Sequence, residues 1–239
     1  MNSAMQQFEV YGVIMQKEEV RFSTDRKGNP VAMLSFLIQN ETSILQILMR
    51  GHQFQHIFIR YDDQIRRVPY SRWRDGQVVK GTIINGRCFP DFEAVHIVER
   101  QIYRGMTVRV AGNIEVIDAN RLRYIAKEIS LISEIPATAS NFSMTIQVGR
   151  LYENRGSARF PCAVTVEGKV IGQSQGMTSL FYTCDEKTAS VLTVGEPFRV
   201  TGKIIRSPWY EQIEGERFFS GIHNELRIMN ATPFSPVHA

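Results

Sequence analysis

Long apolar runs and paired cysteines are missing from this chain of 239 residues. No stretch approaches the roughly 20 apolar residues that a membrane span needs, and the start, MNSAMQQFEV, lacks the basic and apolar regions of a signal peptide. The three cysteines, Cys88, Cys162 and Cys184, are odd in number and far apart, which excludes a disulfide framework or a C-x-x-C metal knuckle. We therefore expect a cytoplasmic protein that is not exported.

Catalytic and cofactor-binding patterns are equally scarce. There is no phosphate-cradling glycine loop, no G-x-S-x-G elbow and no convincing Cys-His pair. His52 and His56 have the spacing of two metal ligands on one helix face, but no third ligand accompanies them. Asp62 and Asp63 have no partner carboxylate with a recognisable spacing. We expect a protein that is not an enzyme and holds neither a metal nor a cofactor.

Charge of one sign is only slightly in excess. The sequence has 28 Lys and Arg against 24 Asp and Glu, a net charge of +4. Residues before Pro136 contribute +3 (18 minus 15) and the rest +1 (10 minus 9), so the weak preference for a polyanionic partner lies in the first half. The length exceeds the usual domain size of about 100 to 150 residues, which favours two compact units.

An internal repeat supports this division. GMTVRVAGNI at Gly105 and GEPFRVTGKI at Gly195 share Gly-x-x-x-Arg-Val-x-Gly-x-Ile at an offset of 90. A second pattern, I-x-x-E, starts at 125 and 222, an offset of 97, and predicts a connecting loop seven residues longer in the second copy. Gly12 and Gly149 are assigned to corresponding places in the opening strands. Three blocks in the same order indicate two copies of one fold.

Both copies alternate apolar and polar residues in short runs between turn signals, which is typical of half-buried antiparallel strands. One helix is expected at 91–103, with Asp91 as N-cap and Val95, Val98 and Ile102 on one face, and a shorter helix at 185–193. The expected strands of the first copy are 8–22, 31–40, 77–89, 106–118 and 121–132. Those of the second copy are 142–153, 160–170, 176–184, 196–207 and 217–229.

Five strands with a helix before the fourth is the order of the oligonucleotide/oligosaccharide-binding (OB) barrel. The helix leading into Gly105-Met-Thr-Val-Arg-Val-Ala-Gly112 and the closing strand at Glu128-Ile129 resemble bacterial and phage single-stranded-DNA-binding proteins. The resemblance covers most of 8–132 and, more weakly, 142–229. It implies a mainly β chain of two tandem OB barrels, with barrel 1 at 1–135, a linker at 136–141, barrel 2 at 142–232 and a flexible tail at 233–239.

The first copy is longer than the second, and we place the extra residues in an insertion at 41–76, between its second and third strands. The later part of the insertion and the residues after it mix cations with aromatic rings, the combination that follows phosphates and stacks bases in single-strand binding. The alternative is a solvated loop whose rings pack into a small core of their own. The candidate residues are Arg60, Tyr61, Arg66, Arg67, Tyr70, Arg72, Trp73, Arg74 and Lys80.

Further candidates lie in two other turns. Trp209 and Tyr210 follow Pro208 in the expected loop between the fourth and fifth strands of copy two and suggest an exposed platform, although Glu211, Glu214 and Glu216 would repel phosphate. Arg26 and Lys27 occupy the tip of the first hairpin, where charged residues are usually only solvated. Arg155 is a similar case.

The first part of the insertion, from Ile44 to Ile59, is apolar and fits either helical spacing or a hairpin turning near Gly51. Copy two lacks it, so we expect it to pack on its own barrel or to bury itself in a two-fold homodimer, the arrangement that we favour.

Together these observations predict a sequence-unspecific single-stranded-DNA-binding protein acting in replication or recombination, with RNA as a further possible ligand. The alternative is an OB-fold protein-interaction module of a replication, plasmid or phage transfer complex. The related proteins often end in an acidic tail that recruits replication proteins, but this sequence ends NATPFSPVHA without an acidic residue, so we do not expect recruitment of that kind.

Overall fold

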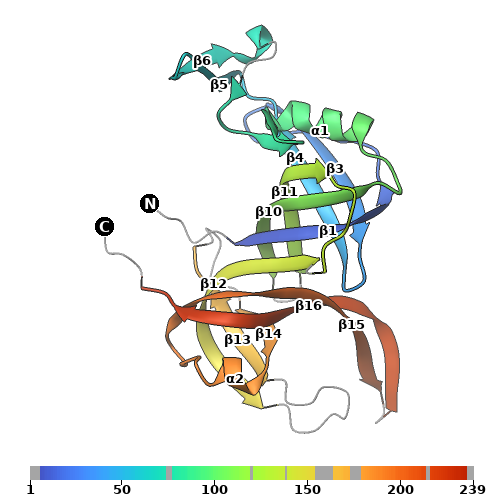
Figure 1. Cartoon of the computed structure of the whole chain (residues 1–239), viewed down its shortest axis with the longest axis vertical. Helices are drawn as coiled ribbons and strands as arrows, with labels where there is room; N and C mark the ends of the chain where they lie inside the picture. Colours follow the sequence, from blue (N-terminus) through green and yellow to red (C-terminus); the bar gives the residue numbers. More distant parts are fainter. Residues whose placement is uncertain are drawn as a thin grey trace.

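A computed structural model describes residues 6–73, 77–118, 121–137, 139–153, 164–172, 179–213 and 216–235, with 77 and 207–223 described by their backbone only. The chain is mainly β, as predicted, and its strands form two groups stacked along the long axis (Figure 1). The upper group, called ring 1, comprises β1 (Gln7–Lys17), β3 (Pro30–Gln39), β4 (Ile44–His52), β10 (Thr107–Asp118) and β11 (Arg121–Leu131). The lower group, called ring 2, comprises β12 (Ser140–Glu153), β13 (Val164–Val170), β14 (Ser179–Cys184), β15 (Pro197–Ile213) and β16 (Glu216–Pro233).

The strand pairings of each group return to their starting strand. In ring 1, β1 pairs antiparallel with β3, β3 with β4, β10 with β11 and β10 with β1, and the parallel pair of β4 with β11 completes the cycle. In ring 2, β12, β13, β14, β16 and β15 repeat this order, again with one parallel pair, between β14 and β16. The two copies found in the sequence therefore have the same connectivity.

One helix precedes the fourth strand of each ring. Helix α1 (Asp91–Gln101) buries Val95, Val98 and Ile102 as predicted. The prediction of Asp91 as N-cap is wrong: Pro90 occupies that position, and the Asp91 carboxylate instead accepts a hydrogen bond from Thr82 Oγ1 at 2.6 Å. Helix α2 (Glu186–Ala189) is shorter than expected, and Asp185 caps it by accepting from the backbone N–H of Thr188 at 2.7 Å.

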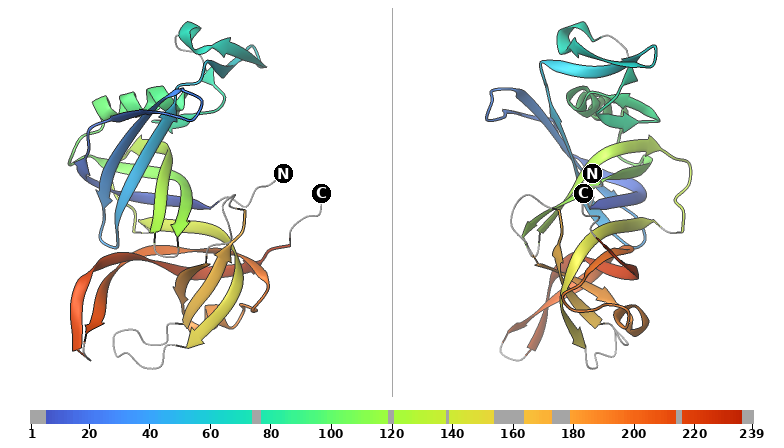
Figure 2. Two further views of the ribbon diagram at one scale, coloured as in Figure 1. Left: turned by 180° about the vertical axis from the view of Figure 1, so that it is seen from behind. Right: turned by 90° about the vertical axis from the view of Figure 1, so that its left-hand side faces the viewer.

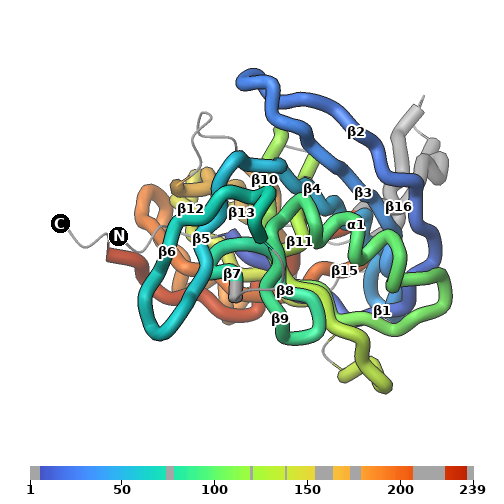
Figure 3. The backbone as a smooth tube through the Cα atoms, turned by 90° about the horizontal axis from the view of Figure 1, so that it is seen from above, coloured from blue at the N-terminus to red at the C-terminus, as the bar shows by residue number. Residues whose placement is uncertain are grey.

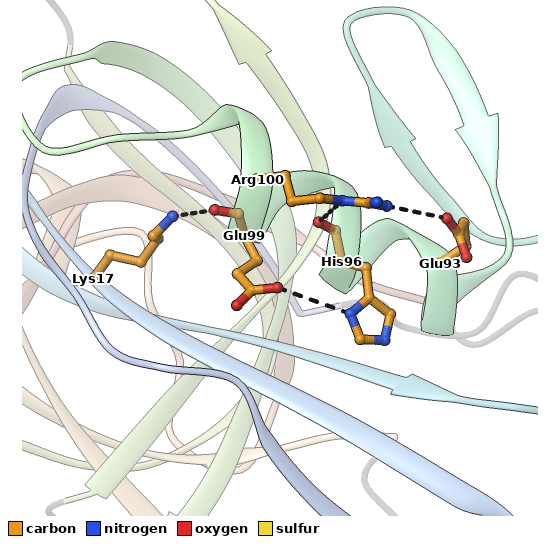
Figure 4. Close-up of polar contacts among 5 residues, drawn as sticks. All are labelled: Lys17, Glu93, His96, Glu99 and Arg100. Atoms are coloured by element: carbon orange, nitrogen blue, oxygen red, sulfur yellow. Dashed lines mark hydrogen bonds and ion pairs between the residues drawn. The ribbon is translucent and has the colours of Figure 1, made fainter.

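A lysine from β1 closes the other end of α1. Lys17 Nζ donates to the carbonyl oxygen of Glu99 (Figure 4) and, at 2.7 Å, to that of Ile102. A positive charge therefore lies at the negative end of the helix dipole. On the helix surface, Arg100 pairs with Glu93 at 3.5 Å and His96 lies 3.9 Å from Glu99. Of these contacts, those of Lys17 tie the C-terminal end of α1 to β1 of ring 1.

The third strand of ring 1 does not lie where we expected it. The prediction placed it at 77–89 after an insertion at 41–76, but Ile44–His52 forms β4, which pairs with β3 along its whole length after a four-residue turn. Leu45, Ile47 and Met49 point into the core and are at most 1 % exposed. The extra segment therefore follows β4, and the span predicted as one strand contains β7 (Gln77–Val78), β8 (Thr82–Ile84) and β9 (Arg87–Phe89).

Part of the sequence repeat was also aligned wrongly. The N–H groups of Gly105 and Gly195 donate to Ile14 O and Val148 O, so the opening strands correspond at an offset of 134 and Gly149 matches Met15 rather than Gly12. Both Met15 and Gly149 lie at a β-bulge. Gly112 opposes Ala126, and Gly202 opposes Ile228, which gives an offset of 102 for the last strand instead of 97. The hairpin of ring 2 is thus longer by 12 residues (26 against 14), not by seven.

The two rings meet through their opening strands, β1 and β12. These pair antiparallel with Phe8 opposite Phe142, Gln7 opposite Ser143 and Glu9 opposite Asn141. Because Phe8 and Phe142 are equivalent at the offset of 134, each strand presents the same positions to the other, as in a two-fold dimer. The chain is therefore a covalent pseudo-dimer with one continuous core.

Asn40, in the turn between β3 and β4, fixes this junction. Its Nδ2 donates to Tyr11 O at 2.7 Å and to Ser140 Oγ at 2.8 Å, while its Oδ1 accepts from the backbone N–H groups of Thr42 and Ser43, both at 2.9 Å. Next to it, the hydroxyls of Ser43 and Ser140 are 2.7 Å apart and buried. One amide thus satisfies polar groups of both rings at once.

We expect Asn40→Ala to lower the free energy of unfolding by about 2 to 3 kcal/mol, because several polar groups at the junction lose their partner together. Urea unfolding followed by circular dichroism measures the loss. Gln46→Ala, which removes an exposed hydrogen bond to Ser35, is the matched control and should change the stability by less than about 0.5 kcal/mol. Equal effects of the two substitutions would contradict this role of Asn40.

Candidate nucleic-acid interface

The segment between β4 and α1 carries a small sheet of its own. It comprises β5 (His56–Tyr61), β6 (Gln64–Pro69) and β7, in the order β6, β5, β7, and lies beside α1 at the end of ring 1 away from ring 2 (Figures 2 and 3). Asp62 and Asp63, considered above as a cation site, form the two-residue turn between β5 and β6, with φ of 45° and 59°. A turn with positive φ at both central residues matches the twist of a hairpin.

One face of this sheet is apolar and turned inward, and the other is exposed. Ile57 and Val78 are buried on the inner face. On the outer face Phe58 opposes Arg67 and Arg60 opposes Ile65, so apolar and basic side chains alternate diagonally. Phe58 and Ile65 are 50 % and 58 % exposed. The cations and the apolar side chains therefore share one accessible surface.

The cations of this segment are not neutralised by neighbouring acids. Among the residues that the structure describes, no carboxylate lies within 4.0 Å of Arg60, Arg66, Arg67, Arg72 or Lys80. The guanidinium of Arg66 lies 4.9 Å from the ring centroid of Tyr61, which is itself exposed, and Arg67 is 3.2 Å from His56 Nδ1. Their positive charge is available to a polyanion in solvent.

Tyr70 and Trp73 combine features of the two alternatives considered for them. Tyr70 begins a 3-10 turn (Tyr70–Arg72) and Trp73 follows it directly; both are half-buried, with ring centroids 6.5 Å apart. Burial and then the charge of Glu93 raise the pKa of Tyr70 to about 12, so its hydroxyl stays protonated at neutral pH. Arg74 lies outside the described residues.

The apolar residues from Ile44 to Ile59 do not form one patch. Leu45, Ile47 and Ile57 are buried within the chain, whereas Phe54 and Phe58 are exposed. The expectation that copy two lacks this segment is wrong for its first part, because β4 is a strand of ring 1 and corresponds to β14 of ring 2. A homodimer is thus not needed to cover it, and the dimer stays a prediction without that support.

The remaining sequence candidates lie elsewhere. Arg26 and Lys27 are exposed at the tip between β2 (Arg21–Thr24) and β3, next to Asp25. Hydrogen bonds from Asn29, and then from Lys27, lower the pKa of Asp25 to about 2. That carboxylate stays ionised and offsets the charge of the tip. Trp209 and Tyr210 are not in a loop: they belong to β15, in the part of its hairpin with β16 that extends beyond ring 2. Arg155 lies outside the described residues.

A groove of about 970 Å³ runs between the outer faces of the two rings and was not anticipated from the sequence. We call it the inter-ring groove. Ring 1 contributes residues of β3, β4 and β11, including Ser35, Gln46 and Leu48, and ring 2 contributes β13, β14 and β16, including Thr165 and Phe181. This volume is in the range of pockets that hold small molecules, or a few nucleotides of a longer strand.

The charges of the inter-ring groove are mixed. Arg21 pairs with Glu18 at 3.2 Å, Arg123 with Glu115 at 3.6 Å and Arg121 with Asp118. These pairs are solvent-exposed, so they are weak and their arginines can exchange partners. On the ring 2 side, Glu225 accepts hydrogen bonds from Thr183 and Arg227. The groove therefore has three arginines and the carboxylates of Glu18 and Glu19 on its ring 1 side, and one engaged carboxylate on its ring 2 side.

Two aromatic side chains of ring 2 complete the surface, and sequence analysis missed both. Phe181 in β14 is 51 % exposed and lines the groove. Tyr152, in β12, pairs with Thr165, another lining residue, and donates to Glu167 at 2.9 Å. Phe181 is followed by the fully buried Tyr182, so the alternation of apolar residues could not show which of these two side chains faces solvent. Only the pairing of β14 with β13 assigns Phe181 to the outer face.

Within the described ranges, no group of three or more His, Cys, Asp and Glu side chains is arranged to hold a metal ion. In the same part of the chain, no helix is long and apolar enough to cross a membrane.

Comparison with known proteins finds likeness in structure but not in sequence. No family model and no curated protein sequence matches the chain. A deletion mutant of the single-stranded DNA binding protein from Thermus aquaticus is similar over 100 % of both chains, with 11 % identity and a TM-score of 0.47. The wild-type form of that protein is similar over 99 % of this chain and 96 % of its own, with 10 % identity and a TM-score of 0.45. At these values the function has to be inferred from the residues of this chain.

Proposed function

We propose that the chain binds single-stranded DNA without sequence preference, as two tandem OB-type barrels, and acts in DNA replication or recombination without being an enzyme. Ring 1 and ring 2 correspond to the barrels at 1–135 and 142–232, with the β5–β6–β7 sheet as the insertion of the first. The linker is shorter than 136–141, since β12 begins at Ser140.

The exposed β5–β6 hairpin carries this proposal. Arg60, Arg66 and Arg67 have no acidic partner in the described part of the chain, and exposed Phe58, Tyr61 and Ile65 lie among them on the two faces of the hairpin. Unpaired strands expose phosphates and base faces together, so they are the polyanion that uses both kinds of side chain. A duplex hides its base faces and would use only the cations.

The aromatic residues of ring 2 fit the same ligand. Phe181 offers an exposed ring in the inter-ring groove, and base-on-ring stacking contributes about 1 to 3 kcal/mol per base. Arg121 and Arg123 lie across the groove, where they can exchange their exposed carboxylate partners for phosphates.

The proposal is tested by titrating the protein with fluorescent poly-dT at several salt concentrations. If Arg60, Arg66, Arg67, Arg72 and Lys80 each neutralise one phosphate, log K should fall with log salt at a slope of roughly −3.5, about −0.7 per contact. Duplex DNA should bind more weakly, and poly-rU in the same assay measures the preference against RNA. A slope near zero, or tighter binding of duplex, contradicts the proposal.

A protein-interaction module of a replication or transfer complex is the second candidate. It is favoured by one observation, the balance of Arg21, Arg121 and Arg123 against Glu18, Glu19 and Glu225 in the groove lining. A surface with paired charges of both signs suits a protein partner as well as a nucleic acid. Retention of a protein partner together with no salt-dependent binding of poly-dT would favour this candidate.

A further inference from the structure

The inter-ring groove lies on the pseudo-two-fold axis that relates the rings. Ile47 of β4 pairs with Tyr124, and Tyr182 of β14 pairs with Leu226. Because Tyr124 and Leu226 are equivalent at the offset of 102, β4 and β14 are equivalent at an offset of 135. Likewise, Ile38 of β3 pairs with Ile14, and Gly168 of β13 pairs with Val148, the equivalent of Ile14. Strands β3 and β13 are therefore equivalent at an offset of 130. With these offsets, the groove is lined by equivalent pairs: Ser35 and Thr165, Gln46 and Phe181, Leu48 and Thr183, Arg123 and Glu225.

A groove with true two-fold symmetry cannot distinguish the two directions of a polymer that crosses its axis. Rotation about the axis turns a strand that runs 5′ to 3′ across the groove into one that runs 3′ to 5′. If both halves presented the same side chains, the rotated strand would make the same contacts and bind with the same affinity.

The side chains of this groove break the symmetry. Gln46 on ring 1 corresponds to the exposed ring of Phe181 on ring 2, and Arg123 corresponds to Glu225, a reversal of charge. The wider surroundings differ in the same sense. Ring 1 carries the basic β5–β6–β7 sheet between β4 and α1, whereas only Asp185 separates β14 from α2 in ring 2.

From this asymmetry, and resting on the proposed function, we infer that the groove holds a DNA strand in one fixed 5′-to-3′ direction. In the favoured direction phosphates face Arg121 and Arg123 of ring 1 and a base stacks on Phe181 of ring 2. The rotated strand exchanges these contacts, so that phosphates meet Glu225 and a base meets Gln46. Like charges at a binding surface are strongly disfavoured, so the two directions differ in affinity.

Photocrosslinking tests the direction. Two dT 12-mers are compared, one with 4-thiothymidine at its 5′ end and one with it at its 3′ end, and peptides crosslinked to the full chain are identified by mass spectrometry. We expect one oligonucleotide to crosslink mainly to ring 1 and the other mainly to ring 2, with a bias of at least about tenfold. The same ratio of ring 1 to ring 2 peptides from both oligonucleotides would overturn the inference.

Gln46→Phe provides a matched variant, because it places an aromatic ring at both equivalent positions and makes the groove more symmetric. We expect this variant to bind poly-dT at least as tightly as the unmodified chain, with a smaller directional bias. An unchanged bias would show that the difference between Gln46 and Phe181 does not set the direction. If neither oligonucleotide binds the unmodified chain, the proposed function itself fails, which the poly-dT titration detects separately.

Discussion

Ile47→Asp is expected to prevent ring 1 from folding, whereas Phe58→Asp, eleven residues further on, should leave the fold intact. Ile47 is fully buried in β4 and pairs with Phe36 of β3 and Tyr124 of β11. A carboxylate there has no partner, and its burial costs more than about 4 to 5 kcal/mol, a large share of the stability of a domain. Phe58 is half exposed on the β5–β6–β7 sheet, where water solvates the new charge.

Circular dichroism and thermal unfolding distinguish the two variants. Ile47→Asp should lose the cooperative transition of the unmodified chain, while Phe58→Asp should melt within a few degrees of it. The comparison matters because both residues belong to the apolar segment from Ile44 to Ile59, which the sequence analysis assigned to a single insertion. A cooperative, unchanged transition for Ile47→Asp would mean that β4 does not close ring 1.

The second large effect is expected from the triple substitution of Arg60, Arg66 and Arg67 by Gln. At about 0.1 M salt each lost phosphate contact removes about 1 kcal/mol of counterion release, so affinity for poly-dT should fall on the order of 100-fold. The salt slope should become less steep by about 2. Stability should change little, since the three side chains are exposed.

A control with the same change in net charge separates local contacts from the field of the whole protein. Arg100, Arg104 and Lys187 are exposed cations outside both the β5–β6–β7 sheet and the inter-ring groove. Their replacement by Gln also lowers the net charge from +4 to +1. If this control weakens binding as much as the first triple variant does, the β5–β6 hairpin is not the binding surface.

Several parts of the fold could be predicted because their signals are local. Alternation identified most strands, and the spacing of Val95, Val98 and Ile102 identified α1. The third strand of ring 1 was missed because β4 is apolar on both faces: Leu45 and Ile47 fill the core, while Leu48 lines the groove. A strand of that kind has no clear period of two, so helix, hairpin and strand fit the sequence equally well.

The candidate site was predictable in its charges but not in its geometry. The basic, aromatic composition of 60–73 singled out the segment that forms the exposed hairpin, because that composition does not depend on register. The inter-ring groove could not be predicted, since its lining comes from strands more than 100 residues apart, such as β4 and β14. Phe181 could enter the site only once the pairing of β14 was known.

The sequence by itself determined that the chain contains two copies of one β unit. Both copies have a glycine at the position of Gly105 and Gly195, because φ near 90° is required there. Both also have one at the position of Gly112 and Gly202, because a Cβ there would meet a carbonyl oxygen at 1.9 Å. Such requirements act on single residues and therefore remain visible as identities. Only the tertiary structure decided the register of β11 and β16 and the pairing of β1 with β12, because hydrogen bonds between strands are made by backbone groups that every residue carries. The inter-ring groove and its asymmetry depend on that pairing.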